Sequence, residues 1–493
     1  MIKKRIALGL VTLFLLTSCA SEKPAALSSL AKYQSQSLKW KSCYGEYQCA
    51  KLLVPINYEK LDTGSFEISL LRFQALDQSR RIGSLVVNPG GPGSSGVDYA
   101  YNAEYIVSPR ILERFDIVGF DPRGVGESAP IKCLSDSEID QSYAADPKPD
   151  SDAELALAIS DMRDYFKKCA ENTQYLGNYR TVDSARDMDI LRSALGDQKL
   201  NFLGKSYGTY LGTLYAHLFP TKVGRFVLDG AVDPNSSNKE ATLGQAIGFD
   251  QALDAFLADC LKGSGCELTG DLDSARNQVT ELLKGISATP LKSKSGREVT
   301  EGLAVIGLAS GLYDSESGWP VLRDAFKEAS LGNGDSFLTL ADQYSGRQEN
   351  GSYLSNENDA IQVIDCLDQG AIEPFSYFKA GVAEFVKEAP IFGPYLAYAG
   401  LSCRYFPELK KLSKPEIIKI VSDPILIIGT TRDPATPYKW AISLKAIFQS
   451  SKLITFDGDG HTGHGRGSKC VDFAVDRYLL SGKSPAVDLT CYP

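Results

Sequence analysis

Short apolar runs rich in β-branched residues recur along the chain, separated by stretches long enough to form helices. Such runs are typical of strands in a sheet that is covered on both faces. Eight runs are expected to be strands: 52–56, 66–73, 84–88, 115–120, 200–203, 225–228, 425–428 and 453–456. Helical patterns lie between several of them, for example over 184–195 and 207–218. The alternation predicts an α/β fold with a mostly parallel, eight-stranded sheet and right-handed crossovers.

The spacing of the runs departs from this alternation in two places. Runs 52–56 and 66–73 are too close for an intervening helix, so they should form a hairpin at a sheet edge. From about 236 to 410 the pattern becomes mainly helical, and a stretch of that length is too long for a loop. We therefore expect a large helical cap, 236–410, inserted between strands six and seven of a core formed by 40–235 and 411–493. The cap should overhang the carboxyl ends of the strands, where open α/β sheets bind ligands.

The first residues carry the features of an export signal. Lys3, Lys4 and Arg5 precede a mostly apolar run over 6–16, which is too short to span a bilayer. The run ends in Leu-Thr-Ser-Cys19, which resembles a bacterial lipobox. We expect 1–18 to be a lipoprotein signal peptide, Cys19 to be lipidated and 19–39 to be a tether. An ordinary signal peptide with an incidental cysteine is the alternative.

The mature protein is accordingly expected to be exported and lipid-anchored at the outer face of the cytoplasmic membrane or the cell envelope, with the anchor either retained or shed. The cysteine count favours the same compartment, because ten of the 11 Cys remain when Cys19 is set aside and disulfides persist in oxidising surroundings. Sequence proximity suggests the pairs Cys43–Cys49, Cys260–Cys266 and Cys470–Cys491, and the four others are paired as Cys133–Cys169 and Cys366–Cys403. With no CxxC motif and only three His, no metal site is expected.

The charge balance argues against nucleic-acid binding. The chain carries 52 Lys+Arg against 61 Asp+Glu, a formal charge of −9. Neutralising nucleic-acid phosphates needs clustered cations, which this balance disfavours.

The sequence Gly204-Lys-Ser206-Tyr-Gly208 directly follows the run 200–203 and precedes a helical pattern. This is the G-x-S-x-G of a nucleophile elbow in its strand–turn–helix context, in which glycines relieve clashes around a tight turn. We predict that Ser206 is a nucleophile exposed at the turn. The alternative is an ordinary glycine-rich helix start.

A serine hydroxyl needs a base, and the chain offers His217, His461 and His464. His217 lies about 16 Å along the helix from Ser206, so a packed or capping role is expected for it. His461 comes first in the glycine-rich loop after the last strand, and we predict that it is the base. His464 is then expected to be a solvated loop residue.

The base needs an acid to orient its ring and stabilise the imidazolium. Asp433 follows the run 425–428 and is the predicted acid, since the order Ser206, Asp433, His461 is that of α/β-hydrolases. Asp229, after the preceding run, is the competing acid, although a turn-forming role before Gly230 suits it better.

The oxyanion of the tetrahedral intermediate needs preorganised donors. One is expected to be the backbone N–H of Tyr207. The other is expected in the loop Asn88-Pro-Gly-Gly91-Pro-Gly, where glycines allow close backbone approach, and Gly91 is the predicted donor. A phosphate-binding loop is disfavoured because no Lys stands at the P-loop spacing.

Together these motifs resemble the secreted tripeptidyl aminopeptidases of actinobacteria, relatives of the proline iminopeptidases within the α/β-hydrolases. The resemblance runs from about residue 40 to the C-terminus and rests on segments 88–93, 119–124, 204–208, 431–436 and 460–462. It implies an α/β-hydrolase fold, Ser206, Asp433 and His461 as the triad, and Gly91 and Tyr207 as the oxyanion hole. It further implies a cofactor-free serine exopeptidase acting on peptides with a free N-terminus. Asn88-Pro stands where iminopeptidases carry His, and little of the insert can be matched.

An exopeptidase of this kind needs an anion for the substrate ammonium. Cys366-Leu-Asp368 resembles a Cys-x-Asp element of the family, and a disulfide at Cys366 could hold Asp368 over the site. Two other functions stay open: a cell-envelope esterase or lipase with the same triad, and a non-catalytic solute-binding lipoprotein. The length of the released peptide, the side-chain preference and the oligomeric state are not determined at this point.

Overall fold

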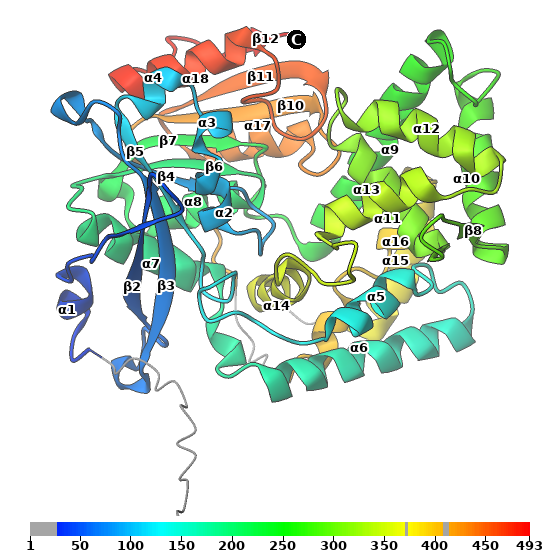
Figure 1. The fold of residues 1–493 in the computed structure, drawn as a ribbon, viewed down its shortest axis with the longest axis horizontal. Coiled ribbons are helices and arrows are strands. Elements are labelled where there is room, and N and C mark those ends of the chain that lie inside the picture. The colour runs from blue at the N-terminus through cyan, green and yellow to red at the C-terminus, as the bar shows by residue number, and fades with distance from the viewer. Residues whose placement is uncertain (1–26, 370–372, 408–413) are drawn as a thin grey trace, which may run out of the picture.

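The computed structural model describes residues 27–369, 373–407 and 414–493 (Figure 1). A ten-stranded sheet runs through it in the order β1-β2-β3-β5-β4-β6-β7-β10-β11-β12. The strands are β1 Lys41–Cys43, β2 Tyr47–Pro55, β3 Ser65–Phe73, β4 Gly83–Asn88, β5 Phe115–Phe120, β6 Leu200–Lys205, β7 Val223–Asp229, β10 Ile425–Arg432, β11 Ser451–Asp459 and β12 Leu489–Cys491. The pairs β1–β2, β2–β3 and β3–β5 are antiparallel. From β5 onward to β12 every neighbouring pair in the sheet is parallel.

All eight predicted strands are present, as β2 to β7, β10 and β11, and the expected β2–β3 hairpin is confirmed. The sheet is nevertheless wider than predicted, because β1 and β12 add one short strand at each edge. Each of these has three residues, too few for a periodic pattern, and each carries a disulfide cysteine.

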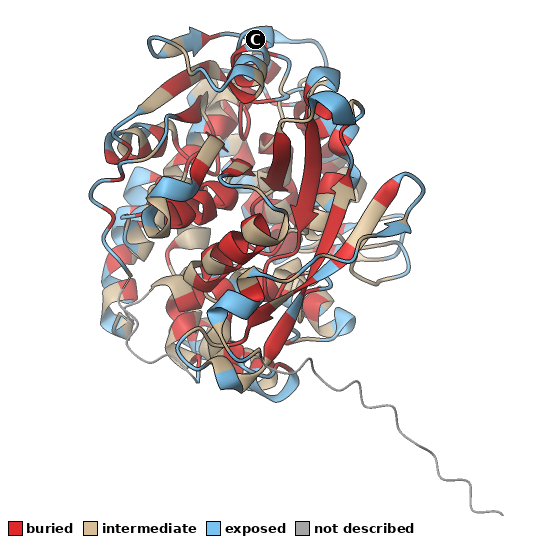
Figure 2. Cartoon of the chain, turned by 90° about the vertical axis from the view of Figure 1, so that its left-hand side faces the viewer, coloured by how far each residue is buried: buried red, intermediate tan, exposed pale blue. Residues whose placement is uncertain are grey.

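Helices cover both faces of the sheet, and the strands are buried between them (Figure 2). One face packs on α7 Thr181–Ala194, α8 Tyr207–Leu218 and α17 Tyr438–Ile447. The other packs on α2 Gly96–Tyr101, α3 Ala103–Ile106, α4 Pro109–Leu112 and α18 Lys469–Ser481. In β4, Val86 points to the first face while Leu85 and Val87 point to the second, as the two-residue period of a strand requires. The predicted α/β-hydrolase class, with a mostly parallel sheet, is confirmed.

The chain between β7 and β10 leaves the sheet and forms a mainly helical cap (Figure 1). It contains α9 Asn238–Lys262, α10 Leu272–Ala288, α11 Glu301–Leu312, α12 Gly318–Ser330, α13 Asp335–Ser345, α14 Glu357–Gln369, α15 Phe375–Glu388, α16 Gly393–Leu396, the turn η5 Leu401–Tyr405 and a small hairpin of β8 Leu291–Lys292 and β9 Glu298–Val299. Most of its helices share an apolar cluster separate from the sheet. Helix α14 differs, since Val363 and Ile364 pack into the core beneath the cap.

A second excursion of the chain joins the cap. Helices α5 Asp136–Ala144 and α6 Asp152–Asn172 lie between β5 and β6 in the sequence, but they pack beside the cap helices (Figure 1). Arg347 of the cap forms an ion pair with Asp140 at 2.6 Å, and Lys148 pairs with Glu301 at 2.7 Å. We had expected this segment within the core, because its helical pattern does not distinguish a crossover from a cap element.

Part of the segment expected as a tether is folded onto the core. Helix α1 Leu30–Gln34 buries Tyr33 completely, and the Tyr33 hydroxyl lies 2.7 Å from Ser65 Oγ. Gln36 exchanges two 2.8 Å hydrogen bonds with the backbone of Leu53. The polar composition of this segment predicts a tether. The buried Tyr33 ring and the Gln36 side-chain amide nevertheless attach it to the core. Cys19 and the predicted signal peptide lie outside the described residues.

All five predicted disulfides are present: Cys43–Cys49, Cys133–Cys169, Cys260–Cys266, Cys366–Cys403 and Cys470–Cys491. This number of disulfides is typical of exported proteins. No helix in the part of the chain that the structure describes is long and apolar enough to cross a bilayer.

Candidate active site

Ser206 stands in the tight turn between β6 and α8, as predicted. Its backbone has φ 53° and ψ −128°, a conformation that a non-glycine residue adopts only under strain. A Cβ atom added at Gly204 would lie 2.6 Å from the Gly208 carbonyl oxygen, and one added at Gly208 would lie 2.7 Å from Asn88 Oδ1. Both glycines are therefore required by close packing.

Asp433 and His461 form a direct pair. The imidazole Nδ1 of His461 lies 2.9 and 3.0 Å from the two carboxylate oxygens of Asp433, whose side chain is buried. Backbone N–H groups of Ala435, Thr436 and Thr462 also donate to this carboxylate, as does the Thr436 hydroxyl. Such a network fixes the carboxylate in place and orients the imidazole ring that it faces.

The pair stands beside the serine turn. The Ser206 N–H donates to the Asp229 carbonyl at 2.8 Å, so the turn is fixed to the end of β7. At the next residue, Gly230, an added Cβ would lie 3.2 Å from His461 Cε1 and 3.1 Å from Thr436 Oγ1. The structure thus brings Ser206, Asp433 and His461 to the carboxyl ends of the strands β6, β10 and β11.

The glycine-rich loop after β4 lies against the same turn. A Cβ atom at Gly90 would approach Ser206 Cβ to 2.9 Å and the Tyr207 nitrogen to 3.2 Å. Gly90 and Gly91 both have positive φ, at 110° and 103°, which explains the glycines. Gly90 lies directly against the serine turn. Gly91, the predicted donor to the oxyanion, is the next residue in the loop.

The motif over 119–124 contacts the segment that follows the glycine-rich loop. Asp121 accepts hydrogen bonds from the Ser95 hydroxyl at 2.6 Å and from the Val97 N–H at 3.1 Å, at the start of α2. Arg123 is fully buried, forms two hydrogen bonds with Asp187 and donates to three backbone carbonyls. Desolvation penalises both charges of this pair, but every donor of the pair has a partner.

Glu357, at the start of α14, is a site residue that the sequence did not reveal. Its carboxylate accepts a short hydrogen bond from the Ser94 hydroxyl. A Cβ atom at Gly91 would lie 3.2 Å from Glu357 Oε1. Burial raises the pKa of Glu357 above its usual 4.5. A cap carboxyl group therefore borders the expected oxyanion loop. Glu357 stands 263 residues after Ser94 in the chain, and no local pattern in the sequence indicated this contact.

Asp368 lies about three turns further along α14 than Glu357, and its carboxylate is held by hydrogen bonds rather than free over the site. Its carboxylate accepts hydrogen bonds from the Thr181 N–H, at 3.0 Å, and from the Thr181 hydroxyl. The same hydroxyl is hydrogen-bonded to the phenol of Tyr207. Burial raises the pKa of Asp368 to about 6. A chain of side chains thus connects α14 to the residue that follows Ser206.

The remaining two histidines lie outside the pair. His217 is exposed in the last turn of α8, which excludes a packed role and leaves the capping role. His464 was expected in solvent but is buried, and this burial lowers its pKa to about 3, so it is neutral. Asp229, the competing acid, does not bind the His461 ring; its carboxylate accepts the N–H groups of Gly463 and His464.

The cap contributes directly to this site. The backbone N–H of His461 donates to the Tyr313 carbonyl at 2.8 Å, and the Tyr313 ring meets the imidazole edge-on with centroids 5.3 Å apart. Arg466, further along the histidine loop, pairs with Asp314 of the cap. The cap therefore packs against the predicted base as well as overhanging the sheet.

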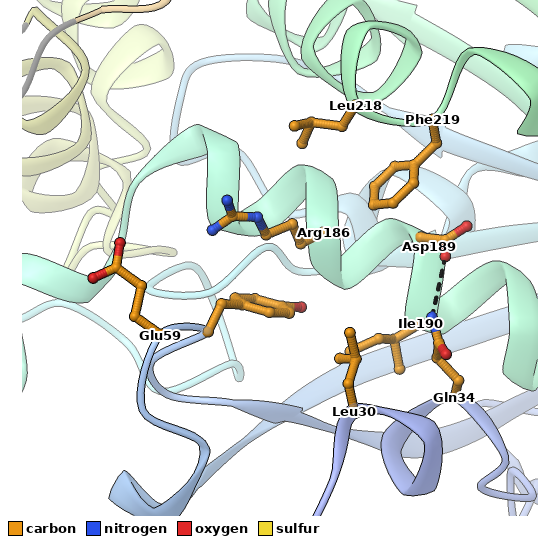
Figure 3. A pocket seen from close by; sticks show the side chains of 9 residues that line it. Leu30, Gln34, Glu59, Arg186, Asp189, Ile190, Leu218 and Phe219 are labelled. Carbon is orange, nitrogen blue, oxygen red and sulfur yellow. Dashed lines mark hydrogen bonds between the residues drawn. The ribbon is translucent and has the colours of Figure 1, made fainter.

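A separate pocket of about 360 Å³ lies between α1, α7 and the end of α8 (Figure 3). Leu30, Ile190, Leu218 and Phe219 supply its apolar wall, while Arg186 and Asp189 already have partners in Asp183 and Arg192. None of the residues lining it belongs to the site just described.

Comparison with known proteins agrees with this geometry. The chain matches the family described as alpha/beta hydrolase fold over residues 83–467. The chain belongs to the α/β-hydrolase family. It is 36% identical over 462 residues to the serine protease Hip1 of Mycobacterium tuberculosis, covering 90% of this chain and 87% of that protein. The predicted class of enzyme, a serine hydrolase related to peptidases, is confirmed.

Two further relatives show the range of this family. A carboxylesterase B of Mycobacterium tuberculosis is 36% identical over 458 residues, covering 90% of this hydrolase and 86% of the relative. The tripeptidyl aminopeptidase of Streptomyces lividans is 30% identical over 487 residues, covering 96% and 90%. The resemblance to tripeptidyl aminopeptidases is confirmed by this match.

Proposed function

We propose that this hydrolase is an extracytoplasmic serine exopeptidase that cleaves peptides near a free N-terminus through an acyl-enzyme on Ser206. The observation that carries the proposal is the His461–Asp433 pair, at 2.9 Å, seated against Gly230 beside the serine turn. The similarity to a serine protease and to a tripeptidyl aminopeptidase over most of the chain supports a peptidase.

The proposed reaction uses only side chains and backbone groups of this chain. Ser206 Oγ attacks the carbonyl carbon while His461 Nε2 takes its proton, and Asp433 stabilises the imidazolium. The N–H groups of Gly91 and Tyr207 donate to the oxyanion. His461 then protonates the leaving amine, and water, deprotonated by the same ring, releases the acyl group. No metal or organic cofactor has a part in these steps.

An exopeptidase must bind the ammonium group at the substrate N-terminus. We propose that the carboxylate of Asp368 binds this group. A carboxylate offers about four acceptor positions, and the two Thr181 donors occupy only part of them. Asp368→Asn should therefore raise KM for peptides with a free amine more than for blocked esters. Equal effects on both substrate types would remove this role from Asp368.

The decisive experiment is mass spectrometry of the products from a random peptide pool, with and without N-terminal acetylation. An exopeptidase of the proposed kind releases short peptides from the free pool only, and their length gives the number of residues removed. Ser206→Ala should abolish both cleavage and labelling by a fluorophosphonate while the protein stays folded. Cleavage retained in this variant, or cleavage of acetylated peptides at equal rate, contradicts the proposal.

A cell-envelope esterase with the same triad is the second candidate, favoured by the 36% identity to a carboxylesterase. Comparison of a tripeptide amide with a short-chain ester separates the two functions. A non-catalytic solute-binding lipoprotein is the third, and it predicts no fluorophosphonate labelling of Ser206.

We further propose that the protein is held at the membrane by a lipid on Cys19, in line with the export that five disulfides indicate. Metabolic labelling with a fatty acid should mark the wild-type chain. Cys19→Ala should lose the label and appear in the soluble fraction. Unlabelled wild-type protein would support an ordinary signal peptide instead.

A further inference from the structure

An ion pair between the partly buried Lys205 and the fully buried Asp229 joins the end of β6, directly before Ser206, to the loop that carries His461. Lys205 Nζ donates to the His464 carbonyl at 2.7 Å and lies 3.9 Å from Asp229 Oδ2. Asp229 has no exposed surface, and its two oxygens accept the N–H groups of Gly463 at 2.8 Å and His464 at 3.0 Å. Three peptide groups of the histidine loop are therefore held by these two side chains.

We propose that Asp229 and Lys205 are positioning residues for His461, which deepens the proposed function and rests on its triad. Asp229 holds both partners of the reaction: its carbonyl accepts the Ser206 N–H at 2.8 Å, and its side chain holds the loop two residues beyond His461. Lys205 directly precedes Ser206 and binds the same loop. Because misplacing a catalytic group by about 1 Å costs about 100-fold in rate, a shared anchor of this kind controls catalysis.

The geometry excludes a simpler role for Asp229 as the triad acid. The carboxylate of Asp433 faces His461 Nδ1, whereas that of Asp229 is occupied by backbone donors of the following residues. Burial of the Asp229 carboxylate is penalised unless the group is paired and hydrogen-bonded, and both of its oxygens accept backbone N–H groups of the histidine loop. Burial raises the pKa of Asp229 and lowers that of Lys205, and in each case the partner's charge opposes the shift.

The test uses the full chain with Asp229→Asn and Lys205→Met, read out by the rate of fluorophosphonate labelling and by kcat and KM for a short-chain ester. Asp229→Asn should slow both reactions about 100-fold, with KM changed little. Lys205→Met should also lower kcat with KM changed little, and Lys205→Arg should restore it. Asp189→Asn is the matched control, since it breaks the Arg192–Asp189 pair, also largely buried, away from the site.

Slower labelling and a lower kcat at unchanged KM in both variants, absent in Asp189→Asn, support the proposal. Wild-type labelling rates and kcat in folded Asp229→Asn, or losses in all three variants that follow thermal stability alone, overturn it. If Asp229→Asn does not fold, Lys205→Met and its rescue by Lys205→Arg decide the matter in the same way. The ester and the fluorophosphonate report on the triad whether or not the natural substrate is a peptide. An enzyme that cleaves esters but no peptides would contradict the proposed peptidase function, and the test of Asp229 and Lys205 would remain valid.

Discussion

The backbone N–H of His461 donates to the carbonyl oxygen of Tyr313, 2.8 Å away, and the two rings meet edge-on. The predicted base is thus held by a residue of the cap, at the end of α11, and not by the sheet alone. A substrate that displaces the cap would disturb the base, so the position of the cap and the catalytic geometry are connected.

Replacing the Tyr313 ring tests this connection. An edge-to-face aromatic contact is worth about 0.5–1.5 kcal/mol. If it stabilises the working position of His461, Tyr313→Ala should lower kcat by about 2- to 10-fold. Tyr313→Phe keeps the ring and should stay near wild type. Steady-state kinetics on one ester check both variants, and equal losses in both would assign the effect to the phenol hydroxyl instead of the ring.

Removing the charge of Asp433 should affect catalysis far more than stability. Asp433→Asn preserves the shape of the side chain but favours the wrong tautomer of His461, and kcat should fall by about 10⁴-fold. The rate of a single turnover, measured together with the thermal midpoint, checks the prediction. A loss below about tenfold in the folded variant would point to another acid.

Asp368 should make stability depend on pH. Its pKa is about 6 in the folded protein against an ordinary 3.8. Between about pH 4 and 6 the folded chain therefore holds a proton that the unfolded chain has released, so this group's contribution to stability falls as the pH rises through that window. Asp368→Asn does not titrate, and its stability relative to wild type should increase from pH 4 to 6 and then level off. Urea unfolding at pH 4, 5, 6 and 7 measures this, and a constant difference between the two proteins would contradict it.

The Cys366–Cys403 disulfide should support activity as well as stability. It ties α14, which carries Glu357 and Asp368, to the turn η5 across 37 residues, a loop for which the chain-entropy estimate is about 4 kcal/mol. Replacing both cysteines by Ala should lower the free energy of unfolding by roughly that amount and also reduce kcat/KM.

The control is the same replacement of Cys43 and Cys49, which closes a loop of only six residues at the far edge of the sheet. We expect a loss of about 2 kcal/mol there with unchanged kinetics. Loss of activity in both double variants, in proportion to stability, would show that α14 has no special requirement for its disulfide.

Local sequence patterns predicted the parts of this protein that depend on near neighbours. The strand runs and the turn at Ser206 were predicted correctly because each is encoded within a few residues of a strand end, and the structure brings Asp433 and His461 into contact. The sequence pattern did not predict that helices α5 and α6 pack beside the cap. Helical periodicity shows that a helix has an apolar face but not which element covers that face. The same limit applies to His464, because its backbone is bound by Lys205 and Asp229, which come from other strands.

The sequence by itself determined the α/β-hydrolase architecture and indicated the residues predicted for the triad, because strand-length apolar runs and the tight glycine turn are local properties. Only the tertiary structure decided what surrounds them. Glu357 comes to the glycine loop, Tyr313 to His461 and Asp229 to the histidine loop across more than 100 residues of chain in each case. Contacts at that separation arise from the packing of whole elements, which fixes neighbours that no local spacing can specify.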